Sequence, residues 1–230
     1  MKPSRVLYLP LFAAAAMMLA LAAGCSTEDS IVNPDQVVGS GRLVSQDRAV
    51  GAFTGIRVTG IANVVIREDP VQALRIEADD NILDRITTTV QGGLLTIGLQ
   101  SGSYSDITVN VYASMETIRR LEVTGSANFS TATPMHTDSL TCRITGAGNM
   151  TIQGSASAAV FEITGAGAIQ AFALTLERGW SIISGTGAIE TTVSRQLTAS
   201  ITGVGSITYA GNPSTVNQTI TGVGSVKPRP

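Results

Sequence analysis

Hydrophobic and polar positions repeat along this chain with a period of about 20 residues. Seven times a β-branched residue is followed by Thr or Ser and then by Gly, and five of these copies carry a second Gly two residues later. From the second copy on, the first glycines are separated by 21, 19, 20, 18 and 19 residues. Such a period predicts a stack of similar coils and not a core with one centre. The first glycines are Gly60, Gly125, Gly146, Gly165, Gly185, Gly203 and Gly222.

Alignment of the copies on this Gly shows two columns that are apolar in every copy. One column lies two residues before the Gly and the other lies four residues after it. Alternate residues of a strand share a face, so we expect both columns to face the interior and the Thr or Ser to face outward. The columns are Val58, Val123, Ile144, Ile163, Ile183, Ile201 and Ile220, and Val64, Phe129, Met150, Ile169, Ile189, Ile207 and Val226.

The pattern predicts an all-β protein, a right-handed parallel β-helix (solenoid) of ~20-residue coils with Gly-x-Gly turns. Right-handed crossovers dominate, and a period of ~19 residues is too short for a strand–helix–strand unit. The first Gly never varies, which predicts a positive φ or no room for a Cβ. The second is replaced by Ala62 and Ala127, so we expect it to need only a small residue. No helical periodicity follows any copy, which argues against a phosphate-binding loop.

The stretch between Gly60 and Gly125 is less regular but still alternates like strands. Gly92-Gly93 predicts a hairpin-like turn. The segment from Asp79 to Asp84 is the best candidate for a short helical turn, with Asp80 or Asn81 as its cap. EF-hand spacing is absent there.

The first 24 residues have the composition of a secretory leader: a basic start with Lys2 and Arg5, then an apolar run. The ending Leu21-Ala22-Ala23-Gly24-Cys25 resembles the bacterial lipobox. This resemblance implies a signal peptide and a lipoprotein whose Cys25 is acylated, palmitate included, and becomes the mature N-terminus anchored in the membrane. The alternative is an uncleaved transmembrane anchor. Ser26, in place of Asp, favours the outer membrane.

These features divide the chain into a signal peptide (1–24), a lipidated Cys with a flexible tether (25–40) and one β-helix domain (41–230). Without Lys2 and Arg5, 13 basic residues remain against 17 acidic ones, a net charge of −4 that argues against nucleic acid as a partner. Leu140, Cys142 and Ile144 alternate with polar residues, which places Cys142 on the apolar face and favours a buried small hydrophobe over a reactive thiol. The closing residues 227–230 carry two prolines and two cations, which we interpret as an edge guard.

Several segments together resemble the family named putative auto-transporter adhesin, head GIN domain. They are the leader with its lipobox, Phe53–Gly60, Ala78–Leu83 and the serial Gly-x-Gly turns, over about residues 50–226. Members resemble pectin-lyase-like right-handed β-helices that retain no catalytic residues. The resemblance therefore implies an adhesive cell-envelope protein and no enzyme.

Few residues suit catalysis or metal binding. Polysaccharide-active enzymes need paired carboxylates or a metal held by acids. After Gly125 the acids are sparse, and an outer Glu-Arg-Glu ladder that includes Arg143 is the simpler explanation of Glu162. The only histidine, His136, has no Cys or His companion, so we expect no metal site and no cofactor.

Trp180 and Ile182 form the one candidate contact patch. They stand five and three residues before Gly185, and odd offsets on this side of the turn face outward. A local bulge that turns Trp180 inward, or a covering role, is the alternative. An exposed pair would mark a contact site for a glycan or protein ligand.

We expect a non-catalytic, adhesin-like or structural envelope lipoprotein; the alternatives are a carbohydrate-binding module or a polysaccharide-active enzyme. Ligand identity and oligomeric state are open at this point.

Overall fold

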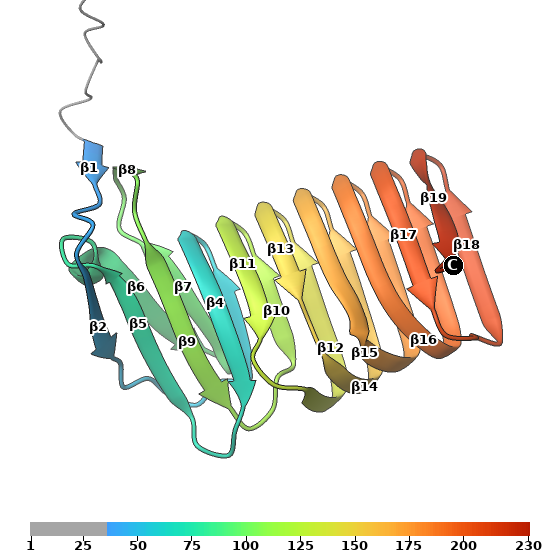
Figure 1. Cartoon of the computed structure of the whole chain (residues 1–230), viewed down its shortest axis with the longest axis horizontal. Coiled ribbons are helices and arrows are strands. Elements are labelled where there is room, and N and C mark those ends of the chain that lie inside the picture. The colour runs from blue at the N-terminus through green and yellow to red at the C-terminus, as the bar shows by residue number, and fades with distance from the viewer. Residues whose placement is uncertain (1–35) are drawn as a thin grey trace, which may run out of the picture. The chain divides into compact units, whose positions relative to one another are not determined.

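The strands of the chain wind into a stack of coils (Figure 1). The computed structural model describes residues 36–230, and the signal peptide, Cys25 and most of the predicted tether lie outside them. Apart from one short 3-10 helix, the regular structure of these residues is entirely strand. The predicted fold class, an all-β solenoid, is confirmed. Within the described residues, no helix is long and apolar enough to cross a membrane.

Each coil contains one strand before its first Gly and one after it. Strands before the Gly stack in parallel as the pre-glycine sheet, and strands after it stack as the post-glycine sheet. Strands β15 and β16 are long enough to belong to both sheets: each begins after one first Gly, in the post-glycine sheet, and ends before the next, in the pre-glycine sheet. The coil strands are β3 (Gly55–Val58), β4 (Ile61–Glu68), β10 (Arg120–Val123), β11 (Ser126–Thr131), β12 (Met135–Ile144), β13 (Ala147–Thr151), β14 (Gly154–Ile163), β15 (Ala166–Ile183), β16 (Thr186–Ile201), β17 (Val204–Ala210), β18 (Thr215–Ile220) and β19 (Val223–Pro228).

The irregular N-terminal stretch folds as a cap on the first coil. Strand β7 (Leu94–Leu99) pairs in parallel with β3, and β9 (Val109–Met115) with β4. Beyond them, β6 (Ile86–Gln91), β5 (Ala73–Asp79) and β2 (Leu43–Asp47) pair antiparallel. The first coil, β3–β4, therefore lies between β7 and β9 on one side and β10 and β11 on the other. The predicted turn at Gly92-Gly93 is confirmed: it joins β6 to β7 with φ values of 55° and 75°.

The two predicted interior ladders form the core. Twelve of the 14 residues are buried, and the two that are not belong to the last coil. Ile220 is 41% exposed, and Val226 is only partly buried, because no further coil covers them within the described chain. Strand β19 extends through Pro228, and the amide of Arg229 donates to the carbonyl of Tyr209 at 2.7 Å, so residues 227–229 continue the last strand.

The first glycine of each coil is required because a side chain has no room there. A Cβ on Gly165 would approach the carbonyl oxygens of Gly146 and Thr145 well inside the 3.0 Å that real Cβ atoms keep from other atoms. Gly165 does not have a positive φ. Of the two predicted reasons, close contact between coils is therefore the correct one.

The expectation that the second glycine needs only a small residue is wrong for the later coils. A Cβ on Gly167 would overlap the carbonyl of Gly148, and Gly167 has a φ of 154°. Ala62 and Ala127 occur only in the first two coils, where the residue has a negative φ and its methyl group is buried. The backbone conformation at this position thus changes between the second and third coils.

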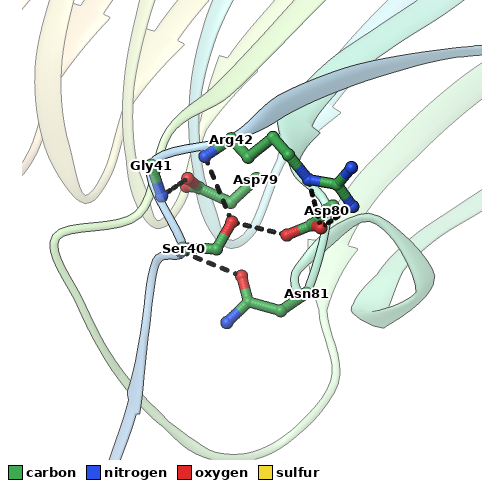
Figure 2. Close-up of polar contacts among 6 residues, drawn as sticks. All are labelled: Ser40, Gly41, Arg42, Asp79, Asp80 and Asn81. Atoms are coloured by element: carbon green, nitrogen blue, oxygen red, sulfur yellow. Dashed lines mark hydrogen bonds and ion pairs between the residues drawn. The ribbon is translucent and has the colours of Figure 1, made fainter.

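The short helical turn after β5 begins later than predicted, and its cap is different. The 3-10 helix η1 covers Leu83–Arg85, and its N-cap is Ile82, without a side-chain cap bond. Asp80 and Asn81 instead bind the incoming chain at Ser40 (Figure 2). The capping prediction is therefore wrong.

Asp79, Asp80 and Asn81 fasten the segment Ser40–Arg42 to the cap. Buried Asp79 accepts hydrogen bonds from the amide of Gly41 at 2.8 Å and from that of Thr108 at 2.7 Å. Asp80 accepts from the Ser40 hydroxyl and pairs with Arg42, and both contacts hold the pKa of Asp80 below its ordinary value. Just before this segment, β1 (Gln36–Val38) pairs with β8 (Ser103–Ser105). Residues 36–40, predicted as tether, are thus part of the folded unit.

Candidate functional site

The outer surface of the pre-glycine sheet carries the predicted contact patch. Trp180 and Ile182 lie in β15, between inward-facing Gly179, Ser181 and Ile183. Trp180 is in register with Val160 of β14 on one side and Thr198 of β16 on the other. Both patch residues are half-buried, so their neighbours cover part of each side chain and leave the rest accessible. A register shift between Leu176 and Arg178 precedes Trp180, but it does not turn Trp180 inward, because Gly179 and Ser181 are the buried residues on either side.

A ladder of alternating charges runs along the same surface beside Ile182. Arg57, Glu122, Arg143 and Glu162 occupy successive strands in register. Arg57 Nε lies 2.6 Å from Glu122 Oε2, and Arg143 Nη2 lies 2.8 Å from Glu162 Oε2. Arg120 adds a second contact to Glu122 at 2.6 Å. The predicted ladder is present and extends one coil further, to Arg57.

Glu122 is the most buried member of this ladder. Burial would raise the pKa of its carboxyl, but hydrogen bonds from Arg57 and Arg120 outweigh it, and the pKa is lowered. Glu122 therefore remains charged and bridges two coils.

A polar groove of about 510 Å³ lies at the corner of the coils away from the glycine turns. His136, Asp138, Ser155, Thr175 and Glu177 are among its lining residues. His136 Nδ1 lies 3.4 Å from Glu68 Oε2, and Glu177 pairs with Arg195 at 3.4 Å. Among the described residues, no three His, Cys, Asp or Glu side chains form a group that could hold a metal ion.

An asparagine ladder on the post-glycine sheet was missed in the sequence. Asn110, Asn63, Asn128 and Asn149 are in register on adjacent strands. The amide of Asn128 donates to Asn63 at 3.1 Å, and that of Asn149 donates to Asn128 at 3.2 Å. Three of these residues stand three positions after the first Gly of their coil, so the repeat alignment contains the signal.

The remaining predicted residues lie where the repeat places them or outside the described chain. Cys25, the predicted lipidation site, is outside it. Cys142 is fully buried in β12, and burial strongly raises the pKa of its thiol, as expected for a packed small hydrophobe. Each first glycine lies at the corner that joins the pre-glycine and post-glycine strands: Gly60, Gly125, Gly146, Gly165, Gly185, Gly203 and Gly222.

The coil pattern can be compared with known families. The family described as putative auto-transporter adhesin, head GIN domain, matches residues 52–213, which is well over half of the chain. The chain belongs to this family. No curated protein matches it.

Solved structures of similar proteins share the fold of this head GIN domain. A putative adhesin from Bacteroides fragilis is 21% identical, with a TM-score of 0.69 over 84% of this chain and 100% of that chain. A putative adhesin from Parabacteroides distasonis is 20% identical, with a TM-score of 0.57 over 85% and 100%. A putative lipid binding protein from the same organism is 21% identical, with a TM-score of 0.53 over 85% and 100%. At these identities the likeness extends to the fold alone.

Proposed function

We propose that the protein is a non-catalytic, adhesin-like lipoprotein of the bacterial cell envelope. In this proposal Cys25 carries the lipid that holds the mature chain in the outer membrane, and the coil stack presents a binding surface. The patch of Trp180 and Ile182 contacts the ligand, which is a glycan or a protein surface. Membership of an adhesin family supports the general role.

One observation carries the proposal: the only tryptophan of the chain points outward from a regular sheet. The exposed residues that precede it in β15, namely Thr175, Glu177 and Arg178, are polar or charged, so Trp180 and Ile182 are the two accessible apolar side chains of this stretch. Indole and isoleucine side chains gain free energy when a ligand covers them, whereas on this surface they contact water. A flat aromatic face is also suited to stacking against a sugar ring.

The charges of the pre-glycine sheet support binding over catalysis. Glu162 and Glu177 each pair with an arginine. A catalytic carboxylate must reach its substrate, whereas these two carboxylates are engaged by arginine side chains. A polysaccharide-active enzyme would be a second candidate, and the arginine contacts of both carboxylates argue against it.

The test compares two aromatic variants on a glycan array and in pull-downs from intact envelopes. Trp180→Ala is expected to abolish capture, because it removes the largest accessible apolar surface of the patch. Tyr112→Ala is the control, since Tyr112 is an exposed aromatic residue that lies in β9 of the post-glycine sheet, away from the patch. Thermal unfolding of both variants separates lost binding from lost structure. Equal binding by the two variants would refute the patch.

A further inference from the structure

A second feature of the pre-glycine sheet is a hollow of about 410 Å³ at the end nearest the cap. Its floor is made of glycine: Gly55 of β3 and the Gly92-Gly93 turn. Three arginines and two threonines surround it: Arg119, Arg120, Arg143, Thr54 and Thr141.

Gly55 lets Arg120 and Leu94 pack closely at one side of the hollow. It is in register with Leu94 on one side and Arg120 on the other, in an outward-facing position. A Cβ on Gly55 would come within 2.9 Å of Arg120 Cβ and 3.1 Å of Leu94 Cδ1. A side chain at position 55 would therefore displace Arg120 or Leu94, both of which line the hollow. The adjacent Gly92-Gly93 turn adds backbone without side chains.

The arginines retain donors that the protein does not use. Arg120 and Arg143 contact Glu122 and Glu162 through Nε and Nη2, which leaves Nη1 of each guanidinium without a partner in the described chain. Arg119 is exposed and makes no ion pair with any described residue. No acidic side chain lines the hollow. Apart from Leu94 and the three glycines, its lining side chains are thus hydrogen-bond donors, three of them positively charged.

We propose that this hollow binds the oxyanion group, a carboxylate or a sulfate, of an acidic glycan. Planar guanidinium groups match the geometry of such oxyanions and remain charged at any physiological pH. The hydroxyls of Thr54 and Thr141 add neutral donors at the rim. The inference rests on the proposed ligand-binding function and specifies its ligand class.

The position of Trp180 favours a glycan over other polyanions. Thr141 of the hollow is in register with Val160, and Val160 with Trp180, so the indole lies two strands away on the same surface. At ~4.8 Å per strand this is ~10 Å. One oligosaccharide can therefore place an acidic sugar over the hollow and another sugar face on Trp180. Nucleic acid would require a larger basic surface and several stacking aromatics, and this chain has a net charge of −2 and a single tryptophan.

The experiment measures binding of the whole mature protein to three soluble glycans by titration calorimetry. An oligogalacturonate carries carboxylates, a dextran sulfate carries sulfates, and plain dextran is the neutral reference. Binding to either acidic glycan, at least about tenfold tighter than to dextran, supports the proposal, and the comparison of the two shows which oxyanion is preferred. Equal binding to all three overturns it.

Two arginine variants locate the site. Arg119→Gln should weaken binding of the acidic glycan about tenfold or more, the loss expected for one charge-assisted hydrogen bond. Arg67→Gln, on β4 of the post-glycine sheet, removes the same charge and should leave binding unchanged. Neither arginine makes a side-chain ion pair in the described chain, so both variants should fold. Equal affinities for the two variants would overturn the assignment of the hollow.

Thr141→Glu gives an independent check, because it places a carboxylate at the rim of the hollow and should also abolish acidic-glycan binding. The outcomes separate this inference from the proposed function. If Trp180→Ala abolishes capture while Arg119→Gln and Thr141→Glu do not, the contact patch stands and the oxyanion site is wrong. If Trp180→Ala has no effect either, the proposed function fails as well.

Discussion

Because the backbones of successive coils are in close contact, we predict that replacement of Gly165 by Ala destabilises the protein strongly. Replacement by Ala adds a Cβ that overlaps the carbonyl oxygens of Gly146 and Thr145. These are backbone atoms, so no rotamer change relieves the overlap. The fourth coil must move away from the third. Its bonds to the third include Gly165 N to Ile144 O at 3.1 Å and Ala166 N to Gly146 O at 2.9 Å.

The cost can be worked out from those contacts. Three backbone hydrogen bonds join the two coils at this corner, from Thr164, Gly165 and Ala166. Each contributes about 1 kcal/mol net, and overpacking adds roughly 1–3 kcal/mol. We expect Gly165→Ala to lower the free energy of unfolding by about 4–6 kcal/mol, a large part of the 5–15 kcal/mol typical of a domain. Gly167→Ala should cost a similar amount, because its Cβ also overlaps a carbonyl and its φ is 154°.

Urea unfolding followed by circular dichroism measures both variants. Gly51→Ala is the matched control: Gly51 has no positive φ, and a Cβ there would lie 4.0 Å from the nearest atoms, those of Val90. That variant should change the free energy of unfolding by no more than about 1 kcal/mol. If Gly165→Ala unfolds at the same urea concentration as Gly51→Ala, contact between coils is not what requires glycine at this position.

Two further predictions concern the ends of the chain. Cys25→Ala should abolish membrane attachment and leave the circular dichroism spectrum unchanged, because the folded unit begins near Gln36; recovery of the mature variant in the membrane pellet would contradict the lipid anchor. Deletion of residues 227–230 should promote dimers or fibres, measured by light scattering. The amide of Arg229 donates to Tyr209 of β17. Because successive amides of a strand point to opposite sides, the nitrogen of Pro228 points to the free edge of β19, where proline has no hydrogen to donate. A truncated protein that stays monomeric at high concentration would refute the edge guard.

The coil architecture could be predicted from the sequence because each coil contacts mainly the segments that come just before and just after it in the chain. Each coil repeats the same turn and the same two apolar columns, and its partner is the next segment of the chain. For that reason the two apolar columns are buried as expected, one as far as Ile201 and the other as far as Ile207. The same argument failed at the second glycine. Ala62 shows that a methyl group fits in the first coil, but the conformation at Gly167 differs and is not visible in the sequence.

The cap and the arginine hollow could not be predicted because their partners are distant in sequence. Asp80 was assigned as a helix cap, whereas it binds Arg42 and also Ser40, which was assigned to the tether. The hollow combines Gly55, the Gly92-Gly93 turn and residues from Arg119 to Arg143. Only the pairing of β3 with both β7 and β10 brings these segments together.

The placement of the first coil also determines the order in which the chain can fold. Strands β3 and β4 have neighbours on both sides only after residues 94–131 are available, because β7, β9, β10 and β11 supply them. This is the slow, high-contact-order part of the molecule, since long loops must close before their contacts form. From β12 on, each new coil adds to a finished neighbour at a sequence separation of about 20 residues. We therefore expect residues 36–131 to fold as one unit and the later coils to add to it one at a time.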